Sequence, residues 1–174
     1  LQISVAQGEC LPFTQEEIRF TGHSIEARLY AEDPSKDFLP ATGNIDLWAP
    51  ADGLDVRIDD GITTGQDIPP FYDPMLAKII CSGPDRETAR QKLVGALKRT
   101  ALFGISNNRE FLIDCLERQS FIKGEVTTAF ISQEFESDSL KKYKPLFEDA
   151  AIAAVIELLI DYKTYKESSL NVSN

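Results

Sequence analysis

Residues 22–34, with the sequence GHSIEARLYAEDP, carry the pattern that decides the fold. Apolar positions alternate there with polar ones, and they are Ile25, Ala27 and Leu29. A period of two is typical of a strand with one buried face. The other face carries Arg28 two residues after Glu26, so a guanidinium lies beside a carboxylate. The stretch therefore predicts a half-buried strand with a charged outer face, ended by the turn residues Asp33 and Pro34.

Three further strands are expected at 44–48, 55–58 and 75–81, with proline and glycine between them. The last of these, MLAKIIC, is almost continuously apolar and lies between Pro74 and Gly83. Such a run is typical of a central strand that is buried on both faces. We therefore expect this segment to lie in the middle of a sheet.

Helical patterns follow the strands. Pro84 and Asp85 begin a helix with an acid at its N-terminus. Its buried stripe is expected at Ala89, Leu93, Ala96 and Leu97. Asn107 and Glu110 predict a capping box at the start of a shorter helix, and a further helical turn is expected around Phe130. Strands first and helices afterwards indicate an α+β fold, in which an antiparallel sheet is followed by packed helices.

Three segments are expected along the chain. Residues 1–8 look like the end of a helix capped by a glycine, and Met75 is the only methionine, so we expect a piece of a longer protein. Residues 9–135 hold the strands and helices of one domain. Residues 136–174 are expected to form a polar linker and then an apolar helix, which leads to the next module.

The composition excludes several classes of partner and site. The 174 residues include 18 basic and 28 acidic ones, for a formal net charge of −10. A chain this acidic repels phosphate backbones and anionic lipids, so neither nucleic acid nor a membrane surface is expected as a partner. The single histidine and the three widely spaced cysteines show no metal-ligand spacing, so no metal site is expected. An odd number of scattered cysteines favours reduced thiols in a reducing compartment.

Arg28 has an ordinary interpretation on the pattern alone. An arginine close to a glutamate on an exposed strand face is usually a solvated ion pair of little energetic value. The surrounding motifs favour another interpretation, because in their order along the chain they resemble the C-terminal domain of biotin carboxylase, as found in biotin-dependent acyl-CoA carboxylases. These motifs are residues 22–34, 38–43 (FLPATG), 69–78 (PPFYDPMLAK) and 128–131 (TAFI). Residues 26–33 are most similar to the carboxylases of propionyl- or methylcrotonyl-CoA.

The resemblance implies an ATP-dependent ligase that carboxylates biotin with bicarbonate. Negative charge collects on the ureido oxygen of biotin when its N–H proton is lost, and a fixed guanidinium lowers such a barrier. The family assigns this catalytic and biotin-binding role to the arginine of the matching motif, so the role is expected at Arg28. Glu26 is expected to position the site. Asp73, held before Pro74, is expected either to orient Arg28 or to form a turn-stabilising hydrogen bond.

The resemblance also implies substrates and partners whose sites lie outside the chain. ATP, magnesium and bicarbonate would bind an upstream ATP-grasp region, because the sequence has no glycine-rich phosphate loop and no acidic cluster for magnesium. The chain alone is therefore expected to be inactive. Biotin would arrive on a carboxyl carrier domain and serve a carboxyltransferase subunit. Arg57 is expected either at a homodimer interface or on an exposed strand.

Two alternatives stay open from the sequence. The same domain serves urea and pyruvate carboxylases, whose first half reaction is the same. A non-catalytic interaction module would leave Arg28 exposed and replaceable, whereas an enzyme would place Arg28 in a cleft. The acyl-CoA carboxylase interpretation implies fatty acid metabolism in the cytoplasm, or in the mitochondrial matrix of a eukaryote.

Overall fold

The computed structural model describes residues 1–135, 140, 154–155, 158–159 and 162. The chain divides into two compact units, Leu1–Leu140 and Lys141–Asn174. Most of the predicted linker and apolar helix lies outside the described residues. The residues of that helix that are described are all helical, namely Ala154, Val155, Leu158 and Leu159. No described helix is long and apolar enough to cross a membrane.

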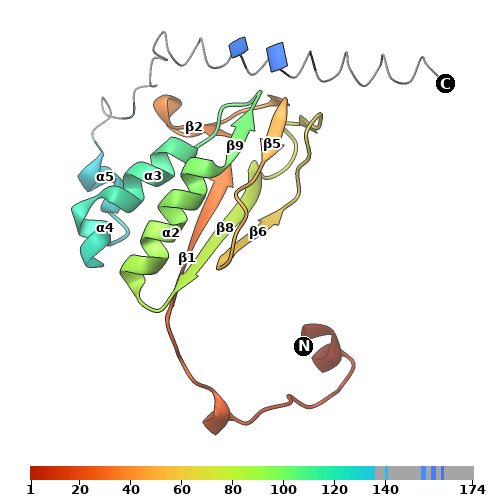
Figure 1. Cartoon of the computed structure of the whole chain (residues 1–174), viewed down its shortest axis with the longest axis vertical. Helices are drawn as coiled ribbons and strands as arrows, with labels where there is room; N and C mark the ends of the chain where they lie inside the picture. The colour runs from red at the N-terminus through yellow and green to blue at the C-terminus, as the bar shows by residue number, and fades with distance from the viewer. Residues whose placement is uncertain (136–139, 141–153, 156–157, 160–161, 163–174) are drawn as a thin grey trace, which may run out of the picture. The chain divides into compact units, whose positions relative to one another are not determined.

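An antiparallel sheet of three strands forms the centre of the first unit (Figure 1). Its order is β1 (His23–Tyr30), β8 (Met75–Gly83), β6 (Val56–Asp60). The register places Ile79 of β8 opposite Ala27 of one neighbour and opposite Ile58 of the other. The central position predicted for the apolar run of β8 is therefore confirmed.

One face of the sheet is covered by α2 (Arg86–Arg99), as Figure 1 shows. The predicted stripe of this helix is confirmed, because four of its positions are fully buried, namely Ala89, Leu93, Ala96 and Leu97. They pack with Ile79 and Cys81 of β8 in one core cluster. Asp85 begins the helix as predicted, since its carboxylate accepts a hydrogen bond of 2.8 Å from the Thr88 N–H.

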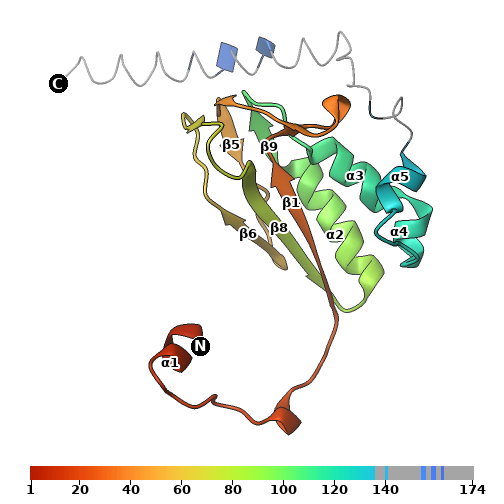
Figure 2. The same ribbon diagram turned by 180° about the vertical axis from the view of Figure 1, so that it is seen from behind.

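The opposite face of the sheet is turned toward the viewer in Figure 2, and none of the described helices crosses it. Lys78 and Ile80 of β8 point to this face, where they are half-buried. The prediction that β8 is buried on both faces therefore holds only at the start of the strand, where Leu76 on this side is 3% exposed. Further along, Ile80 is apolar without being fully buried, so the apolar run extends beyond the part of β8 that is buried on both faces.

Shorter elements complete the unit around this centre. Three strand pairs are β2 (Glu32–Asp33) with β3 (Leu39–Pro40), β4 (Gly43–Asn44) with β7 (Asp67–Ile68), and β5 (Leu47–Ala49) with β9 (Ala101–Phe103). The later helices are α3 (Arg109–Glu117), α4 (Gln119–Lys123) and α5 (Phe130–Glu134). Two 3₁₀ turns are Gln15–Glu17 and Pro34–Lys36. The single strand predicted at 44–48 is divided between β4 and β5.

A short helix is present at the beginning of the chain, as its sequence predicts. Helix α1 (Gln2–Ala6) is short and is followed by Gly8 with φ +89°. The segment at 9–20, between α1 and β1, is exposed. Apolar side chains are exposed there too, among them Leu11, Phe13 and Phe20.

The capping box predicted for α3 is wrong. The N-cap is Asn108, and the preceding Asn107 accepts a hydrogen bond of 3.1 Å from the Arg109 N–H. Glu110 pairs with the Arg109 guanidinium instead of turning back to the helix start. The reason is that Asn108 is held from outside the helix, by the backbone of β1.

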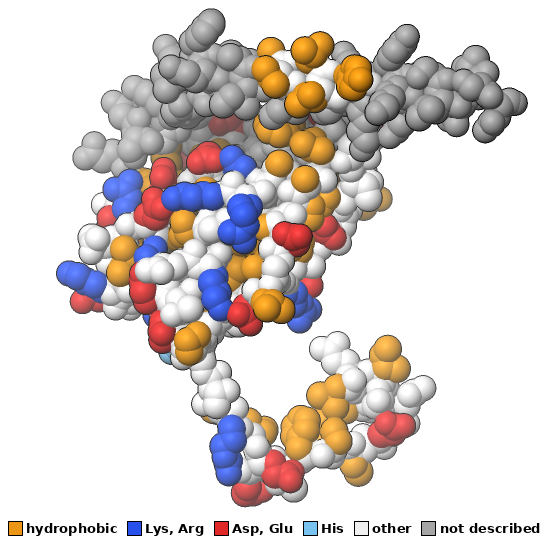
Figure 3. Space-filling model, viewed as in Figure 1, with side chains coloured by type: hydrophobic (Ala, Val, Ile, Leu, Met, Phe, Trp, Pro, Cys, Tyr) orange, Lys and Arg blue, Asp and Glu red, His pale blue; other side chains and the backbone are white. Residues whose placement is uncertain are grey.

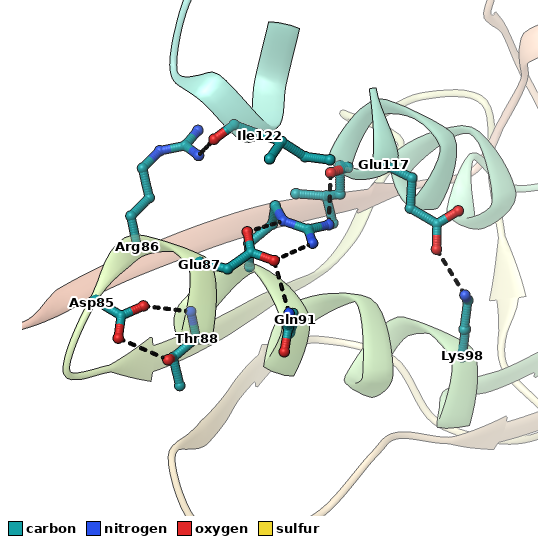
Figure 4. A network of polar contacts seen from close by, with 10 residues as sticks. Asp85, Arg86, Glu87, Thr88, Gln91, Lys98, Glu117 and Ile122 are labelled. Atoms are coloured by element: carbon teal, nitrogen blue, oxygen red, sulfur yellow. Dashed lines mark hydrogen bonds and ion pairs between the residues drawn. The ribbon is translucent and has the colours of Figure 1, made fainter. Parts of the chain in front are cut away.

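Helix α2 is tied to the later helices by its arginines (Figure 4). Arg90, which is 9% exposed, donates to the Leu116 carbonyl at 3.0 Å and to both oxygens of Glu87 at 2.7 and 2.6 Å. Arg86 donates to the Ile122 carbonyl at 2.9 Å. Figure 3 shows Lys and Arg side chains interspersed with Asp and Glu over this face. The negative net charge is therefore not gathered here into one acidic patch.

A pH dependence follows from the Glu87 carboxylate. Hydrogen bonds from Arg90 and Gln91 lower the pKa of Glu87 from 4.5 to about 2. A carboxylate whose pKa is lower in the folded chain than in the unfolded chain stabilises the fold at pH values above the unfolded pKa. This stabilisation is lost as the pH falls through the pKa of the folded chain. The Glu87→Gln variant is therefore expected to be less stable than wild type at pH 7, with a difference that shrinks between about pH 4.5 and pH 2.

Urea unfolding of the wild type and Glu87→Gln across this pH range measures the effect. Glu125→Gln is the control, because Glu125 forms no ion pair within residues 1–135. A stability difference that stays constant as the pH falls would contradict the account.

Candidate functional site

The predicted pair of Glu26 and Arg28 is formed on the outer face of β1. Arg28 Nε donates to Glu26 Oε1 at 2.9 Å, and the two side chains are 58% and 37% exposed. The hydrogen bond uses Nε alone, so the N–H donors on Nη1 and Nη2 remain for the Tyr30 hydroxyl and for a ligand. Glu26 and then Tyr30 raise the pKa of the Arg28 guanidinium. Arg28 therefore keeps its charge at any physiological pH.

A pocket with a volume of about 350 Å³ lies beside this pair. One wall is β1 and its continuation, from Glu26 to Glu32, and the facing wall is α3 from its N-cap Asn108 to Leu116. The polar rim holds Glu26, Arg28, Tyr30 and Glu32. The apolar lining includes Phe38, Phe111, Leu112, Leu116, Phe121 and Ile131. Arg28 is thus both solvent-exposed and part of a cleft, so its exposure does not by itself separate the enzyme from the interaction module.

Phe38 reaches the pocket through a strained turn. Asp37 and Phe38 have φ of 56° and 58°, a region that residues other than glycine rarely adopt. The turn is held by Asp33, whose Oδ1 accepts from the Ser35 N–H at 3.0 Å. The Phe38 ring then meets the edge of Phe111, with 4.9 Å between ring centroids. Backbone strain of this kind is retained where the surrounding structure fixes a side chain in place.

Asp73 lies two residues before β8, and its Oδ1 accepts a hydrogen bond of 2.8 Å from the Met75 N–H. This is the turn-stabilising bond that the sequence left open as one of two roles. Within residues 1–135, Asp73 forms no ion pair with Arg28. Burial and the Asp73 charge raise the pKa of Glu32, so Asp73 acts on the acidic rim of the pocket.

Arg57 lies far from the pocket in the sheet order, on β6 at the opposite edge. Its Nε and Nη2 donate to the two oxygens of Asp59 at 2.8 and 2.9 Å, and its side chain is 73% exposed. The nearby Leu54 is 94% exposed. Arg57 therefore lies on an exposed strand at the sheet edge opposite β1, which is compatible with either of its two expected roles.

Asn108 belongs to the site and was missed from the sequence. It lines the pocket at the start of α3, and its side chain bonds to the backbone of Arg28 and Tyr30. Its neighbour Asn107 offered the same residue type with a glutamate three positions later, so the local pattern selected the wrong asparagine. Only the contact between residues about 80 positions apart distinguishes the two.

The sequence profile described as "Biotin carboxylase C-terminal domain" matches residues 26–133, which include Arg28, Asp73 and Asn108. The chain belongs to the biotin carboxylase C-terminal domain family. It is 42% identical to a biotin carboxylase of Nostoc over 132 residues, which are 76% of this chain and 30% of the Nostoc protein. Its similarity to the mitochondrial methylcrotonoyl-CoA carboxylase subunit alpha of Dictyostelium discoideum is 37% identity over 168 residues, 96% of this chain and 24% of that one.

A solved relative has the same fold as this biotin carboxylase C-terminal domain. It is the biotin carboxylase domain dimer of 2-oxoglutarate carboxylase from Hydrogenobacter thermophilus, in complex with MgADP, ADP and bicarbonate. The two are 33% identical with a TM-score of 0.77, over 83% of this chain and 31% of that one. The antiparallel sheet with packed helices predicted from the sequence is confirmed. The chain spans less than a third of the length of each of these relatives.

Proposed function

We propose that this chain is the part of a biotin-dependent acyl-CoA carboxylase that supplies the arginine on the biotin side of the biotin carboxylase site. The observation that carries the proposal is the position of Arg28. Its guanidinium is fixed by Glu26 at 2.9 Å and lines a pocket, within the segment that matches the family. The other parts of the reaction would lie upstream, in an ATP-grasp region that binds ATP, magnesium and bicarbonate.

Arg28 is proposed to act on the negative charge that collects on the ureido oxygen as biotin loses its N–H proton. A guanidinium that stays protonated and already lines a pocket needs little reorganisation at that moment. Glu26 holds Nε and so leaves the N–H groups on Nη1 and Nη2 for a ligand. The apolar lining of the pocket strengthens this electrostatic interaction, because it lowers the local dielectric.

Asp73 is proposed to orient Arg28 through the charge that it adds to the pocket rim. Asp73→Asn tests the charge alone, because an asparagine keeps the oxygen that accepts from the Met75 N–H. We expect kcat/KM for biotin to fall about tenfold in the intact enzyme, with ATP cleavage unchanged. Biotin kinetics equal to those of the wild type would contradict the orienting role and leave Asp73 with the turn-stabilising hydrogen bond alone.

The partners follow from the same proposal. Biotin would be presented on a carboxyl carrier domain, and the product would be used by a carboxyltransferase subunit that selects the acyl-CoA. Arg57 and the exposed Leu54 are proposed to lie at a homodimer interface, since a solved relative is described as a dimer. The proposed location is the cytoplasm, or the mitochondrial matrix in a eukaryote, with a role in fatty acid metabolism. A urea or pyruvate carboxylase remains the alternative parent.

The proposal is tested with three preparations: the intact enzyme, its upstream part, and this chain. ATP- and bicarbonate-dependent carboxylation of free biotin is measured in each. We expect carboxylation by the intact enzyme, and neither carboxylation nor ATP cleavage by this chain alone. Carboxylation by the upstream part alone at the rate of the intact enzyme would show that the chain supplies no catalytic group.

A further inference from the structure

Asn108 makes three hydrogen bonds to one short length of β1. Its Oδ1 accepts from the Tyr30 N–H at 2.9 Å, and its Nδ2 donates to the Arg28 carbonyl at 3.3 Å. Its own N–H donates to the Tyr30 carbonyl at 3.2 Å. These bonds begin at the carbonyl of Arg28, the residue that carries the guanidinium of the pocket, and end at the carbonyl of Tyr30.

The position of β1 in the sheet explains why these bonds matter. β1 is an edge strand, with β8 on one side and no strand of the described sheet on the other. Backbone groups on such an edge need partners from elsewhere. Asn108 supplies the hydrogen-bond partners that a neighbouring strand would give to the backbone of Arg28 and Tyr30. It is 5% exposed, so water does not replace its bonds readily.

Asn108 also lies where the two walls of the pocket meet. It is the N-cap of α3, and its carbonyl accepts the first helical hydrogen bond from the Leu112 N–H at 3.0 Å. Leu112 lines the pocket, as does Phe111 on the same turn. One side chain therefore fixes the wall that carries Arg28 relative to the wall that carries the apolar lining.

We infer that Asn108 is a positioning residue for Arg28, an inference that rests on the proposed function. Asn108 itself contributes no group to the pocket chemistry that Arg28 supplies. It sets the backbone of β1 against α3, so that the Arg28 guanidinium is held at one distance from a ligand in the pocket. A displacement of a catalytic group by about 1 Å can cost up to about a hundredfold in rate.

Asn108→Asp is the main test variant. The aspartate has the same shape and still accepts from the Tyr30 N–H, but its ionised carboxylate cannot donate to the Arg28 carbonyl. Asn108→Ala removes both side-chain bonds. The matched control is Asn107→Ala, because Asn107 bonds only to Ile105 and Arg109 near the helix start and makes no bond to β1.

The experiment measures biotin carboxylation and biotin-independent ATP cleavage by the intact enzyme. We expect Asn108→Asp to lower kcat/KM for biotin about tenfold, with ATP cleavage changed less than about twofold. Asn107→Ala is expected to leave both activities near those of the wild type. Equal losses in Asn108→Asp and Asn107→Ala would overturn the inference, because they would reduce Asn108 to a helix cap.

The same variants are then made in an Arg28→Ala background. If Asn108 acts through Arg28, the Asn108→Asp change produces no further loss once the guanidinium is gone. A loss of the same size in both backgrounds would overturn the inference while leaving the role of Arg28 intact. Arg28→Ala with full activity would instead overturn the proposed function, so the two failures are distinguishable.

Discussion

Replacing Arg28 by alanine is expected to lower biotin carboxylation by the intact enzyme about a hundredfold. The alanine leaves the developing charge on the ureido oxygen without its guanidinium partner. Bicarbonate-dependent ATP cleavage without biotin is expected to stay near the wild-type rate, because the proposed ATP site lies upstream. Carboxybiotin formation and phosphate release, measured in parallel, separate the two activities.

Two further variants make this result specific. Arg28→Lys keeps the positive charge but loses the planar fork of donors, and we expect it to recover only a small part of the lost activity. Lys98→Ala is the matched control, because the Lys98–Glu117 pair is 57% and 47% exposed, close to the values for Arg28 and Glu26. Full activity of Arg28→Ala would contradict the proposed role of Arg28, and the Arg28–Glu26 pair would then be a solvated surface ion pair.

Replacing Gly104 by alanine is expected to lower the free energy of unfolding by about 3 kcal/mol. Gly104 has φ +98°, and a Cβ there would overlap the Asn44 carbonyl oxygen and lie 2.6 Å from the Asp46 backbone nitrogen. Both neighbours are backbone atoms, so they cannot turn aside as a flexible side chain can. Denaturant unfolding of the chain measures the loss.

Gly65→Ala is the matched control for this effect. Gly65 also has a positive φ, +85°, but a Cβ there meets nothing within 4 Å. We expect it to cost about 1 kcal/mol, from backbone strain alone. Equal losses in the two variants would mean that the close approach of the Asn44–Asp46 segment to Gly104 contributes nothing.

The main elements could be predicted because their patterns are local. The alternation at 22–34 gave β1 and its charged face, and the apolar spacing after Asp85 gave α2 with its buried stripe. Both signals arise from the burial of one face of a single element, which a window of a few residues already contains. Arg28 and Glu26 were found in the same way, since they are two residues apart on one strand face.

The rest depended on contacts between distant segments. Asn108 could not be chosen over Asn107, because only the approach of β1 assigns the cap. Phe38 lines the pocket with a positive φ, a backbone conformation that a phenylalanine in the sequence does not indicate. The strand at 44–48 is divided because β4 pairs with β7 and β5 with β9, which are partners far along the chain. Tertiary pairing overrides the local pattern in each case.

The most direct test of the account is a crystal structure of the intact enzyme with biotin and bicarbonate bound. The account predicts the ureido oxygen of biotin at about 3 Å from a terminal nitrogen of Arg28, within hydrogen-bond distance. Arg28 Nε would still donate to Glu26 in that complex. Biotin bound elsewhere, with the Arg28 guanidinium directed to solvent and bonded only to Glu26, would contradict the central claim.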